Sequence, residues 1–182
     1  MKKLIVFLLG ILLAGTLHAQ RFSLGTNLAD YADFGTLNIS GAVSVSKQWS
    51  LGADVKYNPY LFSRGGEPLS ARQRLFSLGS RFWPWHVYSG WWLGAKMQYQ
   101  EYNRGGIRSE RTEEGDRFGA GLSGGYSYML LPNLNLDVGI GFWGGWGRYT
   151  AYSCPVCGLT LEQGSKMFFL PNDIIFAFSY VF

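Results

Sequence analysis

The chain ends in the stretch DIIFAFSYVF, Asp173–Phe182. Every second residue of this stretch is large and apolar, namely Ile174, Phe176, Phe178, Tyr180 and Phe182. The residues between them are smaller or more polar. Successive side chains of a β-strand point to opposite faces, so this alternation predicts a strand with one face against an apolar medium.

A last strand of this kind, closing on an aromatic residue, resembles the carboxy-terminal signal strand of bacterial outer-membrane β-barrels. The barrel-assembly machinery reads that strand, which makes it an expected partner. Phe178, Tyr180 and Phe182 are then the candidate assembly signal.

Residues 1–19 have the pattern of a secretory signal peptide. Lys2 and Lys3 provide the positive start, Leu4–Leu13 the apolar core and Leu17–Ala19 the cleavage position. The apolar run is shorter than the roughly 20 residues that a transmembrane helix needs. We therefore expect cleavage after residue 19, export, and one outer-membrane domain over residues 20–182. A retained amino-terminal anchor is the alternative.

The composition favours a membrane barrel over a soluble domain. Aromatic residues make up 17% of the chain and charged residues only 15%, beside 25 Gly and 7 Trp. Barrels place aromatic girdles at both membrane interfaces, and their alternation keeps the mean hydropathy near zero, as it is here at +0.01. The net charge of +4 falls to +2 without Lys2 and Lys3. Neither this charge nor export favours nucleic-acid binding.

Eight segments of alternating residues can be drawn, separated by turn-forming residues. The clearest alternates Leu37, Ile39, Val43 and Val45 with small polar residues. The segments are Arg21–Asp30, Leu37–Ser46, Leu51–Pro59, Ala71–Trp83, Trp91–Tyr102, Arg117–Met129, Leu134–Gly147 and Asp173–Phe182. The sequence therefore predicts an all-β fold, an eight-stranded antiparallel up-and-down transmembrane barrel, which we expect to be monomeric.

An even strand count puts both termini on the periplasmic side, and the loops then alternate in length. The predicted periplasmic turns are short: Lys47–Ser50, Pro84–Gly90 and Leu131–Asn133. The predicted outer loops are Tyr31–Thr36, Tyr60–Ser70, Asn103–Asp116 and Arg148–Phe169, and all but the first are long and polar. Short periplasmic turns with longer outer loops are the asymmetry expected of such barrels.

The polar parity puts five charged residues inside the barrel: Asp54, Lys56, Arg81, Lys96 and Asp137. An eight-stranded barrel is just wide enough for side chains to fill it, and lone buried charges are costly. We therefore expect a lumen charge network that plugs the interior. A narrow polar path and a ligand site are the alternatives. A soluble lipocalin-like barrel would turn the apolar parity inward instead.

The predicted outer loops are rich in arginine, a residue that pairs well with phosphate. The candidates for contact with the phosphates of lipopolysaccharide are Arg64, Arg72, Arg104, Arg108 and Arg148. The alternative is that these arginines only balance nearby acidic residues and keep the loops soluble.

Cys154 and Cys157 stand in the motif Cys-Pro-Val-Cys-Gly of the last outer loop. A disulfide, or a reduced pair, would shape this long loop in an oxidising compartment. A redox-active pair is a second alternative, but no thioredoxin-like βαβ pattern surrounds these two cysteines. A zinc site needs four ligands, and the mature chain has no other Cys and only His86, so a site shared between two chains is the remaining route. We expect no metal and no cofactor.

Catalysis has weak support, because Ser, His and acid cannot be assembled into a triad around His86. We therefore expect a non-enzymatic outer-membrane protein with a surface, structural or envelope-assembly role. A lipid-modifying enzyme and a small pore are the alternatives.

The chain resembles small outer-membrane barrels of Bacteroidota that are grouped as a domain of unknown function. The similarity rests on Asn27-Leu28-Ala29, Trp49–Gly52, Tyr102–Gly106, Gly119–Tyr126 and the Cys-Pro-x-Cys-Gly loop before the last strand. It implies the barrel fold and the outer-membrane location, and it brings no activity. Some relatives lie near genes for fimbrial or surface-assembly proteins, which implies partners of that kind.

Overall fold

The structure is a computed structural model that describes residues 22–64, 67–106, 111–153 and 158–182. Nine strands and one short helix lie in these ranges. They are β1 (Phe22–Asn27), α2 (Leu28–Ala32), β2 (Leu37–Ser44), β3 (Trp49–Asn58), β4 (Leu61–Arg64), β5 (Glu67–Phe82), β6 (Gly90–Gly105), β7 (Thr112–Leu131), β8 (Leu134–Tyr152) and β9 (Thr160–Val181). The predicted signal peptide, residues 1–19, lies outside the described residues.

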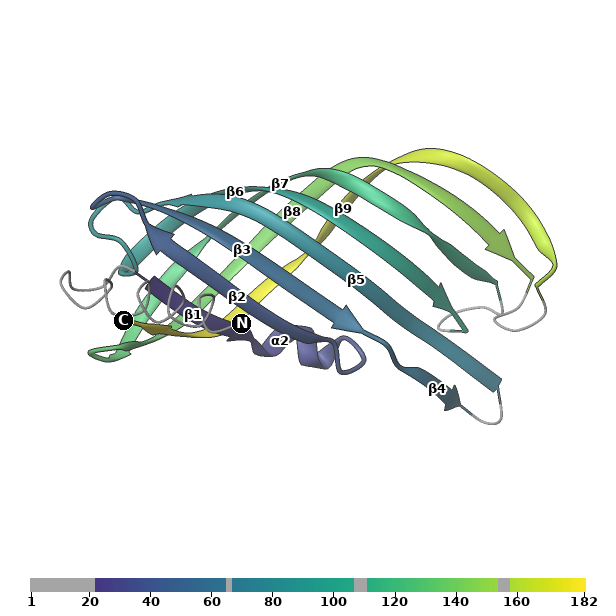
Figure 1. Ribbon diagram of the computed structural model, residues 1–182, viewed down its shortest axis with the longest axis horizontal. Coiled ribbons are helices and arrows are strands. Elements are labelled where there is room, and N and C mark those ends of the chain that lie inside the picture. Colours follow the sequence, from purple (N-terminus) through teal and green to yellow (C-terminus); the bar gives the residue numbers. More distant parts are fainter. Residues whose placement is uncertain (1–21, 65–66, 107–110, 154–157) are drawn as a thin grey trace, which may run out of the picture.

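Eight of the strands close into an antiparallel barrel (Figure 1). Each pairs with the next along the chain, except that β3 pairs with β5 and the short β4 adds to the far part of β5. The circle closes where Ser23 to Asn27 of β1 lie opposite Val181 to Ala177 of β9. The predicted fold class, an eight-stranded up-and-down antiparallel barrel, is confirmed.

The two ends of the barrel differ. At one end, here named the closed end, short turns join β2 to β3, β5 to β6 and β7 to β8, and β9 finishes beside the start of β1. At the opposite, extended end, β5 to β9 run well beyond the first three strands (Figure 1). These five strands have 16 to 22 residues, against 6 to 10 in β1, β2 and β3.

The long strands correct the predicted outer loops. Most of residues 60–70, 103–116 and 148–169 is strand. Cross-strand polar contacts hold these extensions together: Asn103 Nδ2 donates to Glu114 Oε2 at 2.9 Å, and Tyr152 Oη donates to Glu114 Oε1 at 2.6 Å. A β-ladder satisfies its backbone groups whatever the side chains are, so polar sequence continued the strands without any apolar alternation to reveal them.

The first predicted strand is also corrected at its end. Strand β1 stops at Asn27, and Leu28 begins the helix α2 instead of continuing the strand. The Asn27 side chain caps the helix by accepting from the Ala29 N–H at 3.3 Å. It also donates to the Ile174 carbonyl at 2.9 Å and accepts from the Phe176 N–H at the same distance, so it continues the pairing with β9.

Side chains alternate between an exterior and an interior face as the sequence predicts. In β6, Trp91, Leu93, Met97 and Tyr99 are exposed, while the residues between them are mostly buried in the barrel. The same parity puts Ile174, Phe176, Tyr180 and Phe182 outside in the last strand. In the described part of the chain, no helix is long and apolar enough to span a membrane.

Candidate functional site

The five predicted lumen charges all lie on the interior face, but only two of them pair with each other. Arg81 lies 3.3 Å from Asp137, and its guanidinium covers the ring of Trp92 at 4.3 Å. Asp137 also accepts hydrogen bonds from the hydroxyls of Ser127 and Ser179. Asp54 accepts from Ser77 Oγ at 2.8 Å.

The other two predicted lumen charges, Lys96 and Lys56, pair with acids that are not among the five predicted residues. Lys96 Nζ lies 2.7 Å from Asp173, and Lys56 Nζ lies 2.7 Å from Asp30 and 3.9 Å from Asp173. The polar parity of the last strand already included Asp173. Asp30 was hidden because it comes from α2 rather than from a strand.

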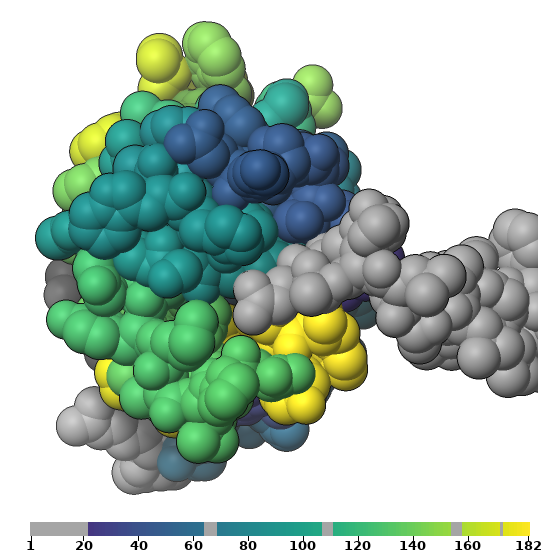
Figure 2. All heavy atoms as spheres, turned by 90° about the vertical axis from the view of Figure 1, so that its left-hand side faces the viewer, coloured from purple at the N-terminus to yellow at the C-terminus, as the bar shows by residue number. Residues whose placement is uncertain are grey.

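Two further layers fill the barrel on either side of these ion pairs. At the closed end, Trp83, Val87, Tyr88, Trp92, Ile175, Ala177 and Val181 form a buried apolar cluster. Figure 2 faces this end, where the segment around residues 80–100 (teal) and the β7–β8 turn (green) pack together. Toward the extended end, Gln73 donates to Asp33 and Thr36 and accepts from Gln100. Between these layers the interior has a cavity of about 100 Å³.

The exterior face carries a wide apolar band. Near the closed end it is rich in aromatic residues, with Trp49 packed on Phe82 at 5.1 Å and Trp91 on Tyr126 at 5.2 Å. Tyr180 and Phe182 of the candidate assembly signal lie exposed there, 4.9 Å apart, and Phe178 is half-buried. Toward the extended end the band stops at one paired row of exposed aromatic residues: Phe76, Tyr99, Phe118 and Trp146.

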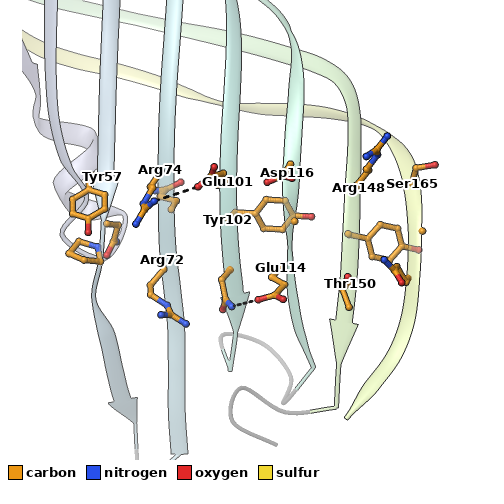
Figure 3. Close-up of a pocket in the computed structure, with 18 residues that line it drawn as sticks. Tyr57, Arg72, Arg74, Glu101, Tyr102, Glu114, Asp116, Arg148, Thr150 and Ser165 are labelled. Carbon is orange, nitrogen blue, oxygen red and sulfur yellow. Dashed lines mark hydrogen bonds and ion pairs between the residues drawn. The ribbon is translucent and has the colours of Figure 1, made fainter. Parts of the chain in front are cut away.

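Charged residues begin in the next exterior row. Arg74, Glu101, Asp116 and Arg148 lie opposite one another on β5 to β8, two residues beyond the aromatic row. The following row contains Arg72, Asn103, Glu114 and Thr150. We name these two rows the exterior shelf. They line an open hollow of about 1040 Å³ with Tyr57, Gln163 and Ser165 (Figure 3).

The acids of the shelf are more fully engaged than its arginines. Glu114 takes hydrogen bonds from Asn103 and Tyr152, and Glu101 takes one from Tyr99 Oη at 3.3 Å. Arg74 lies 3.9 Å from Glu101, with its side chain 72% exposed. Within the described residues, Arg72 and Arg148 have no carboxylate within 4 Å. These two guanidinium groups are therefore available to an anion.

The five arginines predicted to contact lipid phosphate do not all lie in the same part of the structure. Arg72 and Arg148 lie on the shelf, together with Arg74, which the sequence reading left out of the set. Arg104 is on the interior parity, and its Nη2 lies 2.8 Å from Asp33, so it does not join them. Strand parity, and not position in a predicted loop, sets the direction of its side chain.

Several predicted residues lie outside the part that the structure describes. These are Arg108, the side chain of Arg64, and both Cys154 and Cys157. The alternatives for the Cys-x-x-Cys motif stay open. Among the described residues, no group of three or more His, Cys, Asp and Glu is arranged to hold a metal ion. His86 lies in the turn between β5 and β6, with Nδ1 3.0 Å from the Val87 carbonyl.

A second polar network stiffens the interior face of the extended end. Glu113 binds Lys166 at 2.7 Å, Arg117 at 3.4 Å and the Tyr102 hydroxyl. Arg117 also lies over the Tyr102 ring at 3.8 Å. Burial alone would raise the pKa of Glu113, but the hydrogen bonds from Lys166 and Tyr102 and the charges of Lys166 and Arg117 outweigh it and hold the pKa below its usual value.

Comparison with known proteins identifies the family of this chain, and the function of that family is unknown. A family model described as "Protein of unknown function (DUF3575)" matches residues 4–182, nearly the whole chain. The comparison with curated proteins found no match. The function must therefore be argued from the barrel itself.

Proposed function

We propose that this chain, which belongs to the DUF3575 family of proteins of unknown function, is a non-enzymatic integral barrel of the bacterial outer membrane. Its exterior shelf contacts the phosphate-bearing headgroups of the surrounding lipid, lipopolysaccharide included. One observation carries this proposal: the exterior apolar band ends at an aromatic row, and charged residues begin in the next row. The resemblance to Bacteroidota barrels supports the same location and a role in the cell envelope.

The width of the band agrees with a membrane. In β7 the exterior apolar run extends from Phe118 to Tyr128. Ten steps of about 3.3 Å make about 33 Å along the strand, which is about 25 Å of height at a tilt of about 40°. Transmembrane strands are tilted by about 35–45°, and their apolar band is about 25 Å tall with aromatic girdles at both edges. The band on this barrel is thus of the size that a thin outer membrane requires.

The shelf is suited to headgroups because of its position and its charges. Arginine offers a planar fork of donors that matches phosphate oxygens. Arg72 and Arg148 have no acidic partner among the described residues, and Arg74 has only a distant one at 3.9 Å. Glu101 and Asp116 lie between Arg74 and Arg148, so the shelf also offers acceptors for amines or for the cations that bridge phosphates.

The filled interior argues against the small pore. An apolar cluster, a layer of ion pairs and a layer of amides occupy the barrel one after another, and the cavity between them is about 100 Å³. We therefore expect no conductance in planar bilayers. The described serine hydroxyls that bond a carboxylate, Ser77 on Asp54 and Ser127 on Asp137, lie inside this filled barrel, so they do not favour the enzyme alternative.

Two measurements test the proposal. First, the protein in isolated outer membranes should migrate differently on a gel with and without boiling in detergent, because a folded barrel resists unboiled detergent. Recovery of the protein in the soluble periplasm would overturn the proposal.

Second, binding to immobilised lipopolysaccharide should fall about tenfold or more in Arg72→Gln/Arg148→Gln, as expected for charge-assisted contacts. Arg111→Gln is the control, since Arg111 already pairs with Glu162 at 2.8 Å.

A further inference from the structure

An apolar groove crosses the exterior face of β5 to β8 beside the shelf. Its volume is about 1040 Å³. Four small residues, one from each strand, form its floor: Ser80, Ala95, Ala120 and Gly144. Ser80 lies opposite Ala95, and Ala120 opposite Gly144, so the floor continues obliquely from strand to strand.

Large side chains border this floor on both sides. Leu78 and Met97 are 55% and 57% exposed along one side, and Leu122 is 69% exposed along the other. Phe142 and Phe169 stack at 5.8 Å with nearly parallel rings where the groove reaches β9. Within the apolar band, the wall is therefore hollowed here instead of presenting an even layer of large side chains.

The groove and the shelf lie on the same face of one strand. Gly144, Trp146 and Arg148 are successive exterior residues of β8. Gly144 and Arg148 are thus about 13 Å apart along the strand, at about 3.3 Å per residue. Arg148 has no carboxylate within 4 Å among the described residues. The groove and the Arg148 guanidinium group therefore lie on one face of β8, with the exposed ring of Trp146 between them.

We propose that the groove and Arg148 form one binding site, here named the seat, for a phosphate-bearing lipid. An acyl chain lies along the groove, and the phosphate lies on Arg148. This inference rests on the proposed membrane location and goes beyond it, because it names one bound lipid rather than general contact with headgroups. The occupant follows from complementarity: an anionic group at one end and a flexible apolar chain at the other match the two parts of the seat. An uncharged lipid would leave Arg148 unused, and free phosphate would leave the groove unused.

Native mass spectrometry of the full-length folded barrel tests the seat. The protein is exchanged into mild detergent with phosphatidic acid or with the diacylglycerol of the same acyl chains, which lacks the phosphate, and the lipid that remains bound is counted. Wild type should retain one phosphatidic acid and much less diacylglycerol. Ala120→Leu fills the groove and Arg148→Gln removes the charge, and each should lower retention about tenfold or more. Val138→Leu, which adds bulk elsewhere on the exterior face, and Arg111→Gln should retain the lipid.

Each opposite result overturns the inference. Unchanged retention in Ala120→Leu would remove the groove from the site, and equal retention of diacylglycerol would remove the phosphate contact. Displacement by an equal concentration of inorganic phosphate would show a shelf that binds free phosphate alone. A boiling-dependent gel shift verifies that each variant is folded. A folded, membrane-integrated barrel without bound lipid would refute only the seat, whereas failure to integrate would refute the proposed function.

Discussion

Removal of the Asp173 carboxylate by Asp173→Asn should strongly destabilise the barrel. Asp173 is 7% exposed and lies 2.7 Å from Lys96 and 3.9 Å from Lys56. Lys56 keeps a second acid, because Asp30 lies at 2.7 Å. Lys96 has no other carboxylate within 4 Å among the described residues. The substitution therefore leaves one ammonium group, 14% exposed, unpaired in the barrel.

The magnitude follows from this asymmetry. Removal of one partner of a buried ion pair costs about 3–5 kcal/mol, because the remaining charge is uncompensated. Lys96→Met should cost less, about 1–3 kcal/mol, since Asp173 retains Lys56 and its carboxylate can still be neutralised. The double variant Asp173→Asn/Lys96→Met removes both charges and should be close to wild type, so the two losses are far from additive.

The assay is urea unfolding of the barrel in detergent micelles, followed by the gel mobility of folded and unfolded forms. It gives the free energy of unfolding of each variant in the double-mutant cycle. Arg74→Gln is the exposed control: its 72% exposed side chain predicts a loss of less than about 1 kcal/mol. A double variant as unstable as Asp173→Asn alone would refute the reasoning, because the loss would then not come from the orphaned Lys96.

Three further perturbations test other parts of the fold. Asn27→Ala removes the helix cap and the contacts to β9, and should lower the free energy of unfolding by about 2 kcal/mol; a neutral effect would contradict the bridging role. Gly119→Ala places a Cβ in steric clash with the Gly144 carbonyl oxygen and should cost about 3 kcal/mol, while Gly41→Ala, with its nearest atom at 3.9 Å, should be tolerated in the same titration. Because the pKa of Glu113 is lowered in the folded state, its stabilisation is present above its ordinary value of 4.5 and is lost as the pH falls below it. Limited proteolysis should therefore cut the extended end faster at acidic pH, and Glu113→Gln should weaken that dependence.

The alternating sequence predicted the barrel because the alternation has a single physical cause. Within the apolar band the exterior positions are apolar and most interior ones are small or polar, apart from the cluster around Trp83 and Trp92 at the closed end, so Leu37–Ser46 and Trp91–Tyr102 indicate strands directly. The same cause explains the failure beyond the apolar band. There the exterior row consists of charged residues such as Arg74, Glu101 and Asp116. Because the apolar alternation ends at this row, the sequence predicts loops where the structure has strands.

The candidate site was predicted only in part because it depends on register. Arg72 and Arg148 are 76 residues apart in the numbering of the chain. Only the successive pairing of β5 with β6, of β6 with β7 and of β7 with β8 brings their rows together. Glu101 could have been suspected, since a charge at an otherwise apolar parity marks the end of the band. The groove is harder to foresee, because Ala95 and Ala120 become neighbours only diagonally across two strands.

The arrangement of charge in this barrel indicates where its function must be sought. Inside, the ion pairs of Lys96, Arg81 and Lys56 are satisfied by acids of the same chain, and apolar and amide layers enclose them. A network that is satisfied in this way has little to offer a ligand, and it stabilises a closed wall. Outside, Arg72 and Arg148 lack acidic partners among the described residues and lie next to the apolar band. The interior thus provides the rigidity, and we propose that recognition falls to the exterior wall, where a phosphate-bearing lipid would meet both the charge and the apolar surface.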